Sequence, residues 1–535
     1  MTETTRADVL IVGSGIMGAA ATALLRESDP RTRIVMVDGG VAIGRAPGVH
    51  LHDVADPELW SKYNQRVASG IQGLYTGAEV IADVARDARQ LEPGMVHSSA
   101  FGEDAAAMPA SAIAWNAGGM GVHWTAATPW PGADETFDYG DPEAWQADLE
   151  TARRLLNVSP SPIGPTRAGE IVLDTLCGLF AGRVSADRGP QPMPMAVVPT
   201  ASGLRPRTSP STIFPAMAAG FELAGGEPGA GDAAQLDPAF TLLLGTMATG
   251  ILIDTDGTRV LGARVRRIAD GAVTDLHADI VLVCADTVRT PQLLFASGIR
   301  SPALGRYLNE HAFITGRVLM DLERFGVTTE ELPLPREGEF CTDSLWIPQN
   351  GSVQPFHGQI MNSTYVDEEG TPIAYSVGLS LYTPVESRPE NRLVFSDTET
   401  DLVGMPKVTF EFAYSERDRA LIDRALDEVE TIAEAFGSFD PASERMLLPP
   451  GSSLHLTGTV RSGTADDGTC VCDPSGRVWG YDNLYVAGNG VIPTAIVANS
   501  TLTGTVTAVR AARSIIRQLA PQLADRTTES PERTL

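Results

Sequence analysis

Short apolar runs and a glycine-rich turn dominate the first 40 residues. A largely apolar run at residues 8–12 leads into Gly13-Ser14-Gly15-Ile16-Met17-Gly18 and an Ala- and Leu-rich segment, and a second run at residues 33–37 ends at Asp38. Short apolar runs bounded by turn residues are typical of buried strands, and the longer segment between them has the length of a helix. The order therefore predicts a βαβ unit.

The glycines of this turn have the spacing of a dinucleotide-binding motif. Gly13 permits a tight turn, Gly15 lets the backbone approach a pyrophosphate, and Gly18 allows helix and strand to pack closely. Asp38 lies 20 residues after Gly18, where a ribose-binding carboxylate is expected. The following helix N-terminus would offer free N–H groups to the phosphates. An ordinary glycine-rich turn between a strand and a helix is the structural alternative.

Two later patterns predict further elements. An apolar run at residues 280–284 predicts another strand, after which Thr290 is expected to cap a short helix that Pro291 opens and Gly298 closes. Apolar residues recur at helical spacing between Ser415 and Gly437, which predicts an amphipathic helix packed on a core.

The last quarter of the chain carries the candidate chemistry. His455 and Asn499 flank a segment that is predicted to form a strand, a glycine-rich turn and the start of a helix. An imidazole and a carboxamide brought together provide a proton acceptor and a hydrogen-bond partner for an alcohol that loses hydride. Taken singly, His455 could be a structural histidine and Asn499 a helix N-cap.

Composition restricts the classes of function. A net charge of −27 would repel a phosphate backbone, which argues against nucleic acid as a partner. The sequence shows no secretory signal and no apolar run that could span a bilayer. Its five cysteines have neither a disulfide framework nor metal-ligand spacing, so we expect no metal site and a cytoplasmic location. A chain of 535 residues predicts two large domains.

Several blocks together resemble the glucose-methanol-choline (GMC) oxidoreductases: the N-terminal glycine turn and residues 290–299, 304–311 and 455–503. Residues 118–129, 355–360 and 390–396 are similar to the pyranose-oxidase branch of that family. The resemblance implies an α/β protein with a Rossmann-like FAD-binding domain and a discontinuous α+β substrate domain built on an antiparallel sheet. The implied segments are 1–45, 90–130, 236–312 and 440–520 for the FAD-binding domain, and 131–235 and 313–439 for the substrate domain.

Two segments are expected to lie outside these domains. Residues 46–89 resemble an arm that contacts neighbouring subunits, and a lid within one chain is the alternative, so a homo-oligomer stays open. Residues 521–535 are polar and are expected to form a flexible tail.

FAD, and not NAD, is the cofactor that the resemblance implies. Val122 stands where a threonine is expected, and related enzymes hold FAD both with and without a bond to the histidine matching His123, so a covalent link through His123 stays open. Ser500 stands where the family has a proline. The residues that match the family's FAD contacts are Gly13, Gly15, Gly18, Asp38, Gly119, Met120, His123, Trp124, Gly488, Asn489, Ser500 and Thr501.

The same resemblance assigns the catalytic roles. His455 is expected to take the alcohol proton, and Asn499 to hold the substrate oxygen. Gln359 matches a glutamine that contacts the sugar ring, and Thr125 is expected near the flavin N5. A surface or packing role is expected for histidines 50, 52, 97, 277, 311 and 357.

Two charged sugar contacts of the pyranose-oxidase branch are missing, because Ser380 and Ser363 stand at their positions. This change favours a larger, partly apolar glycoside over a free monosaccharide. The predicted reaction is oxidation of a secondary ring hydroxyl of a pyranose sugar or glycoside, at C3 in preference to C2, with hydride passing to the flavin and electrons to O2 or another acceptor. The alternatives are a pyranose 2-oxidase of free monosaccharides, a sugar dehydrogenase with another acceptor, an NAD-linked dehydrogenase and a non-catalytic flavin-binding protein.

Overall fold

The computed structural model describes residues 6–44, 46–53, 58, 87–201, 205–223, 237–334, 339 and 341–528. Its first sheet confirms the predicted βαβ unit, and all residues of the first strand are buried, which explains its nearly continuous apolar run. The strands follow the order β6-β2-β1-β9-β8-β7, and β17 also pairs with β9. Their bounds are β1 (Ala7–Val12), β2 (Ile34–Val37), β6 (Phe240–Leu243), β7 (Thr246–Ile253), β8 (Val260–Arg267), β9 (Val273–Val283) and β17 (Leu484–Val486).

The parallel part of this sheet creates one functional edge. β6, β2, β1, the second half of β9 and β17 all run in the same direction, whereas β8 pairs antiparallel with β7 on one side and with the first half of β9 on the other. The carboxyl ends of the parallel strands therefore lie along one edge, where open α/β sheets bind ligands.

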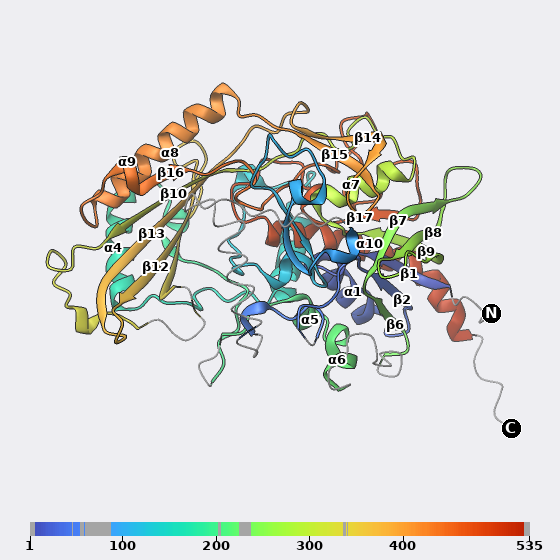
Figure 1. Ribbon diagram of the computed structural model, residues 1–535, viewed down its shortest axis with the longest axis horizontal. Helices are drawn as coiled ribbons and strands as arrows, with labels where there is room; N and C mark the ends of the chain where they lie inside the picture. The colour runs from blue at the N-terminus through green and yellow to red at the C-terminus, as the bar shows by residue number, and fades with distance from the viewer. Residues whose placement is uncertain are drawn as a thin grey trace.

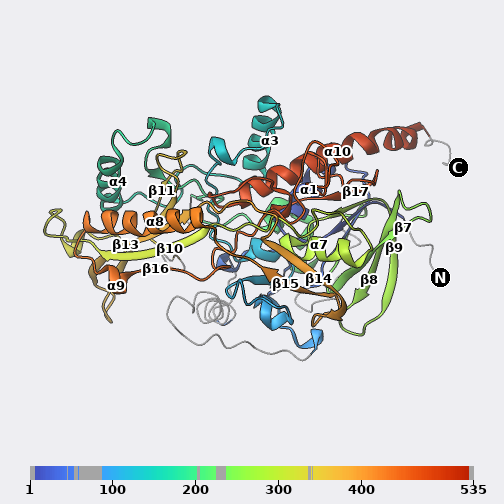
Figure 2. The same cartoon turned by 90° about the horizontal axis from the view of Figure 1, so that it is seen from above.

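A second sheet is antiparallel throughout, in the order β16-β10-β13-β12-β11-β5. In Figures 1 and 2 it lies at the end of the molecule opposite to β7, β8 and β9, with α8 alongside β10 and β13. Its strands are β5 (Gln191–Pro192), β10 (Ala312–Leu319), β11 (Asp343–Ile347), β12 (His357–Val366), β13 (Pro372–Thr383) and β16 (Arg445–Leu447). Two small sheets pair β3 (Gly94–His97) with β4 (Ala112–Trp115), and β14 (Arg392–Thr400) with β15 (Pro406–Glu411).

The helices cover both sheets. α8 confirms the amphipathic helix predicted after Ser415: Ser415 and Asp418 form a capping box at its start, and its buried stripe joins the core of the second sheet. α1 and α10 pack against each other beside the first sheet. The helices are α1 (Ile16–Ser28), α3 (Pro142–Leu155), α4 (Arg167–Phe180), α5 (Pro210–Ile213), α6 (Ala216–Leu223), α7 (Asp286–Ala296), α8 (Glu416–Glu434), α9 (Pro441–Glu444) and α10 (Thr501–Thr528).

The predicted start of α7 at Thr290 is wrong, because the helix begins at Asp286. Pro291 lies inside the helix and cannot donate to the carbonyl of Thr287. The hydroxyl of Thr459 donates to that carbonyl instead, at 2.5 Å. A donor from a distant segment thus replaces the missing one, and the helix continues through the proline.

Three other predictions concern the C-terminal tail, the border between the two domains and the arm. α10 runs past Pro521 to Thr528, so the first part of the predicted tail is helical. β16 pairs with β10 in the second sheet, although residues 440–520 were expected in the FAD-binding domain. A strand of three residues is too short to show an alternating pattern of apolar and polar residues in the sequence. Most of the proposed arm, including residues 54–57 and 59–86, lies outside the described residues. The remaining domain boundaries stay a prediction.

Candidate active site

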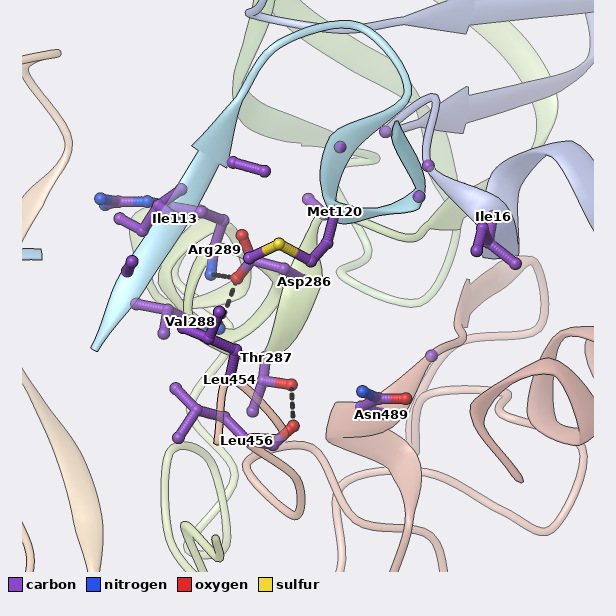
Figure 3. A pocket seen from close by; sticks show the side chains of 18 of the residues that line it. Ile16, Ile113, Met120, Asp286, Thr287, Val288, Arg289, Leu454, Leu456 and Asn489 are labelled. Atoms are coloured by element: carbon purple, nitrogen blue, oxygen red, sulfur yellow. Dashed lines mark hydrogen bonds between the residues drawn. The ribbon is translucent and has the colours of Figure 1, made fainter. Parts of the chain in front are cut away.

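A cavity of about 450 Å³ follows the carboxyl edge of the first sheet. Gly13, Asp38, Cys284 and Gly488, which follow β1, β2, β9 and β17, all line it, and we call these four residues the nucleotide edge. Figure 3 shows Met120, Arg289 and Asn489 reaching the same space from three separate segments. The cavity is thus built from parts of the chain that are far apart in sequence.

Two glycines of the N-terminal turn have the mechanical roles that were predicted for them. Gly13 has a φ of +104°, and a Cβ there would lie 2.4 Å from the carbonyl oxygen of Cys284. A Cβ on Gly18 would lie 2.2 Å from the carbonyl oxygen of Gly13. Gly15 lines the cavity, whereas Gly18 is not among the lining residues and serves the packing of α1 on β1.

Asp38 lies at the end of β2 as expected and lines the cavity. Its carboxylate accepts hydrogen bonds from the Ser14 backbone N–H at 2.9 Å, the Ser14 hydroxyl at 2.6 Å and the Gly40 backbone N–H at 2.8 Å. Burial raises the pKa of Asp38, and these three donors oppose that rise. The carboxylate therefore ties the glycine turn to β2, and its role toward a ribose stays a prediction.

The short helix at Gly119–Val122 brings a second group of predicted residues to the cavity. The cavity is lined there by Gly119, Met120, His123, Trp124 and Thr125. His123 Nε2 lies 2.8 Å from Oδ1 of Asn116, so this nitrogen carries the proton. His123 Nδ1 is buried without a partner among the described residues. Burial lowers the pKa of His123 to about 3, which leaves a neutral ring with a free lone pair on Nδ1.

Further buried polar atoms along the cavity also lack partners within the described part of the chain. They are Oδ1 of Asn489 and the Nε and Nη2 atoms of Arg289, whose Nη1 binds Glu103 and Asp401. Unpaired buried polar atoms are costly unless a ligand or water satisfies them. Together with the glycine turn, these atoms fit a dinucleotide that carries phosphates and ring nitrogens.

The start of α10 is placed differently from the expectation in one respect. Asn499 and Thr501 line the cavity, but Ser500 does not. The Ser500 side chain is buried behind the wall, and its hydroxyl accepts a hydrogen bond from Nδ2 of Asn489 at 2.8 Å. Ser500 therefore orients another lining residue and does not itself face the cavity.

His455 and Asn499 meet, as predicted. Nε2 of His455 lies 3.5 Å from Nδ2 of Asn499, and Nδ1 of His455 lies 2.7 Å from Nε2 of His311. On the other side, Oδ1 of Asn499 lies 3.0 Å from Nε2 of His357. We call His311, His357, His455 and Asn499 the histidine cluster.

Sequence reasoning missed His311 and His357, for which a surface or packing role was expected. Both side chains are fully buried and bind the two residues that carry the candidate chemistry. Each lies in a block that resembles the family, residues 304–311 and 355–360, and that position was the signal available in the sequence. The ring of Tyr382 packs beside both, with centroids 4.6 Å from His311 and 5.5 Å from His357.

Burial keeps the histidine cluster neutral. It lowers the pKa of His455 to about 4 and that of His357 to about 3, and it holds the pKa of His311 well below its usual value. At pH 7 all three rings are therefore uncharged, and each has one protonated and one unprotonated nitrogen.

A buried carboxylate shapes the loop that carries His455. Glu310 accepts hydrogen bonds from the backbone N–H groups of Gly451 and Ser453 and, at 2.6 Å, from the Ser453 hydroxyl. The Ser453 oxygen in turn accepts the backbone N–H of His455 at 3.1 Å. The loop is thus folded around one acidic side chain.

Glu135 does the same for the loop that carries Asn499. Its Oε1 accepts the backbone N–H groups of Val497 at 2.6 Å and Ala498 at 2.8 Å, and its backbone carbonyl accepts the Thr494 hydroxyl at 2.8 Å. Both Glu135 and Glu310 are buried. Neither loop has regular secondary structure before its functional residue, so these carboxylates satisfy N–H groups that a strand would otherwise pair.

The second sheet contributes the remaining wall. Gln359 on β12 pairs across the sheet with Ser380 on β13, and both line the cavity together with Met361 and Thr125. Ser363 lies farther along β12 and is not among the lining residues. Two positions lack the charged sugar contact of the pyranose-oxidase branch, and of these only Ser380 faces the cavity.

Comparison with known proteins agrees with this geometry. Models of the GMC oxidoreductase family match residues 233–313 and 387–508. The C-glycoside 3-oxidase of Microbacterium trichothecenolyticum is 36% identical over 97% of this chain and 98% of its own. The chain belongs to the GMC oxidoreductases. As a member of this family it is an oxidoreductase, and the family implies FAD as its cofactor, as the sequence predicted.

More distant relatives place this GMC oxidoreductase in the same branch and fold. The pyranose 2-oxidase of Tricholoma matsutake is 29% identical over 77% of this chain and 74% of its own. The structure of the Aspergillus oryzae formate oxidase, solved in a study of FAD modification, superposes with a TM-score of 0.64 at 13% identity, covering 97% of this chain and 100% of that one. The predicted fold class and the resemblance to the pyranose-oxidase branch are confirmed.

Two observations on the described residues concern a metal site and a helix that could span a membrane. Among residues 6–528, apart from the gaps given above, no group of His, Cys, Asp and Glu side chains is arranged to hold a metal ion. In the same residues, no helix is both long and apolar enough for a bilayer crossing. The cytoplasmic location stays a prediction.

Proposed function

We propose that this GMC oxidoreductase is an FAD-dependent oxidase of a secondary ring hydroxyl, C3 in preference to C2, in a pyranose sugar or glycoside, with a keto sugar as product. The similarity to a C-glycoside 3-oxidase supports the substrate class and the C3 position. The observation that carries the proposal is the pair of atoms at the cavity wall, Nε2 of His455 and Nδ2 of Asn499, 3.5 Å apart. Two nitrogens at this separation can both contact one hydroxyl oxygen.

The two side chains divide the work on that hydroxyl. His455 is neutral, so its Nε2 accepts the hydroxyl proton as a general base. An amide N–H of Asn499 donates to the oxygen and stabilises the negative charge that develops there. FAD, when bound, supplies the hydride acceptor. Gly13, Gly15 and Asn489 would hold it, and the N-termini of α1 and α10 would favour its anionic groups.

The wall beside Gln359 supports a glycoside over a free monosaccharide. Ser380 and Met361 provide no charge, so a sugar ring there finds only neutral partners, the Gln359 amide and the hydroxyls of Thr125 and Ser380. A hydroxyl that loses water without finding a partner costs about 1–3 kcal/mol. Apolar atoms of an aglycone would gain from the same surface.

The substrate is tested by anaerobic absorbance spectra of the purified protein against free glucose and matched aryl O- and C-glucosides, with the carbonyl of the product located by NMR. We expect the glucosides to bleach the flavin with a higher kcat/KM than glucose and to give a 3-keto product. A preference for glucose with a 2-keto product would favour a pyranose 2-oxidase, and a colourless protein would overturn the proposal. Peroxide formation in air distinguishes an oxidase from a dehydrogenase.

We propose further that His123 serves FAD through Nδ1, the nitrogen that Asn116 leaves free. Precipitation in acid separates a covalent bond from a contact, because covalently bound flavin stays with the protein pellet. In either case His123→Ala should change the flavin spectrum or its reduction potential, and an unchanged spectrum and potential would refute the role of His123.

A further inference from the structure

We propose that His311 and His357 are positioning residues that decide which nitrogen of His455 is unprotonated and which atom of the Asn499 amide faces the substrate. The inference rests on the proposed function, since that function gives the substrate oxygen to these two atoms. Both histidines act through another residue. Each is hydrogen-bonded on its far side to a group that can only accept or can only donate, and that group fixes which ring nitrogen carries the proton.

The first chain of hydrogen bonds begins at the backbone carbonyl of Ile496, which lies 3.2 Å from Nδ1 of His311. A carbonyl oxygen only accepts, so Nδ1 of His311 carries the proton. The ring is neutral, and its Nε2 must therefore accept. The donor is Nδ1–H of His455 at 2.7 Å, which leaves Nε2 of His455 unprotonated.

The second chain begins at Nε1–H of Trp346, which donates to Nδ1 of His357 at 2.9 Å. An indole N–H only donates, so the proton of neutral His357 is on Nε2. This N–H lies 3.0 Å from Asn499 and requires an acceptor there, which is the amide oxygen Oδ1. The Nδ2 group of Asn499 is consequently turned toward Nε2 of His455.

The two chains end in complementary groups. One presents a lone pair and the other an N–H, which are the partners that the hydrogen and the oxygen of a single hydroxyl require. Either chain reversed would give two donors or two acceptors at this point. A base histidine held in the wrong tautomer loses most of its catalytic effect even when its position is unchanged.

The tautomers can be measured directly by ¹⁵N NMR of the FAD-loaded protein with ¹⁵N-labelled histidine, with signals assigned by single substitutions. We expect the proton on Nδ1 in His455 and His311 and on Nε2 in His357. A proton on Nε2 of His455 would overturn the inference. This readout needs no substrate, so it stands apart from failure of the proposed function, which would appear as wild-type flavin that no sugar or glycoside reduces.

Kinetic variants test the same point with matched pairs. Gln can accept from His455 and donate to Ile496 as His311 does, whereas Leu can do neither. His311→Leu should slow anaerobic flavin reduction at least about tenfold with less than about a threefold change in KM, and His311→Gln should recover most of the rate. FAD content and Tm are measured for both. Equal rates for the two FAD-loaded variants would contradict the role of His311.

The Asn499 side is tested by His357→Leu, His357→Gln and Trp346→Phe. Gln can accept from Trp346 and donate to Asn499, so it should again restore what Leu loses. Trp346→Phe keeps most of the buried ring but removes the donor that fixes His357, and we expect a loss of about threefold to tenfold in kcat. If His357→Leu retains the wild-type rate with full FAD content, the second chain has no positioning role.

Discussion

The nucleotide edge and the histidine cluster meet in one cavity but are built in opposite ways. The nucleotide edge consists of residues that lie one or two positions after parallel strands, so backbone geometry alone brings them together. The histidine cluster joins side chains from β12 and from three segments outside helices and strands, and their mutual hydrogen bonds define it. We therefore expect changes at the nucleotide edge to act on FAD content, and changes in the cluster to act on rate with FAD retained.

The largest expected effect on rate comes from the cluster. His455→Ala should keep FAD bound yet slow anaerobic flavin reduction by glycoside at least about 100-fold, because the proton acceptor is lost. Stopped-flow absorbance measures the rate, and the exposed His277→Ala serves as the matched control. Bleaching at nearly wild-type speed would remove His455 from the mechanism.

A glycine in the turn that carries Gly13 should show the opposite phenotype. Gly18→Ala places a Cβ against the Gly13 carbonyl, so the turn must move, and we expect FAD content to fall about tenfold with about 1–3 kcal/mol of lost stability. Gly178→Ala in α4, where a Cβ meets nothing within 4 Å, should leave FAD content unchanged. Flavin absorbance per protein and thermal unfolding give both quantities. Full FAD content in Gly18→Ala would break the contrast between the two regions.

A smaller effect is expected from the wall of the second sheet. Gln359→Ala removes one polar contact to the sugar, which should lower kcat/KM about fivefold while FAD content and Tm stay near wild type. Steady-state kinetics with an aryl glucoside measure the loss. An unchanged kcat/KM would place the sugar elsewhere in the cavity.

The smallest expected effect is the contribution of His455 to the pH profile. The base must be unprotonated, so activity is present above the pKa of His455 and is lost as pH falls through that value, about 4. Between about pH 5.5 and 8, His455 should therefore contribute no inflection to kcat/KM, whereas Glu310 in the neighbouring loop, whose pKa burial raises to about 7, can contribute one. An inflection near pH 6.5 that persists in Glu310→Gln would mean that His455 is less isolated from solvent than its burial indicates.

These two regions also differ in what the sequence alone could predict. Gly13, Gly18 and Asp38 were identified because their roles depend on short spacings within one βαβ unit. His455 and Asn499 were identified from the predicted strand, turn and helix that they flank, and the resemblance then assigned their roles. His311 and His357 were not identified, because a histidine's partner depends on tertiary structure. Whether such a ring packs, binds or orients another side chain cannot be read from its neighbours in the chain.

The start of α7 was mispredicted for the same kind of reason. Thr290 and Pro291 have the local pattern of a helix start, and only the hydroxyl of Thr459, from a segment more than 160 residues away, makes a proline inside the helix acceptable. Ser500 was likewise expected to contact the cofactor, but its hydroxyl accepts a hydrogen bond from Asn489. In both cases a hydrogen bond formed only in the folded protein decides the outcome.

Glu310 and Glu135 have a consequence for how the enzyme responds to heat. Each organises a loop whose backbone depends on one carboxylate and not on a ladder of strand pairs, so each loop can open as a small cooperative unit. On gradual warming we expect turnover to disappear before far-ultraviolet circular dichroism reports any melting of the sheets. Inactivation and unfolding would then be separate events, and cooling from the interval between them should restore the enzyme.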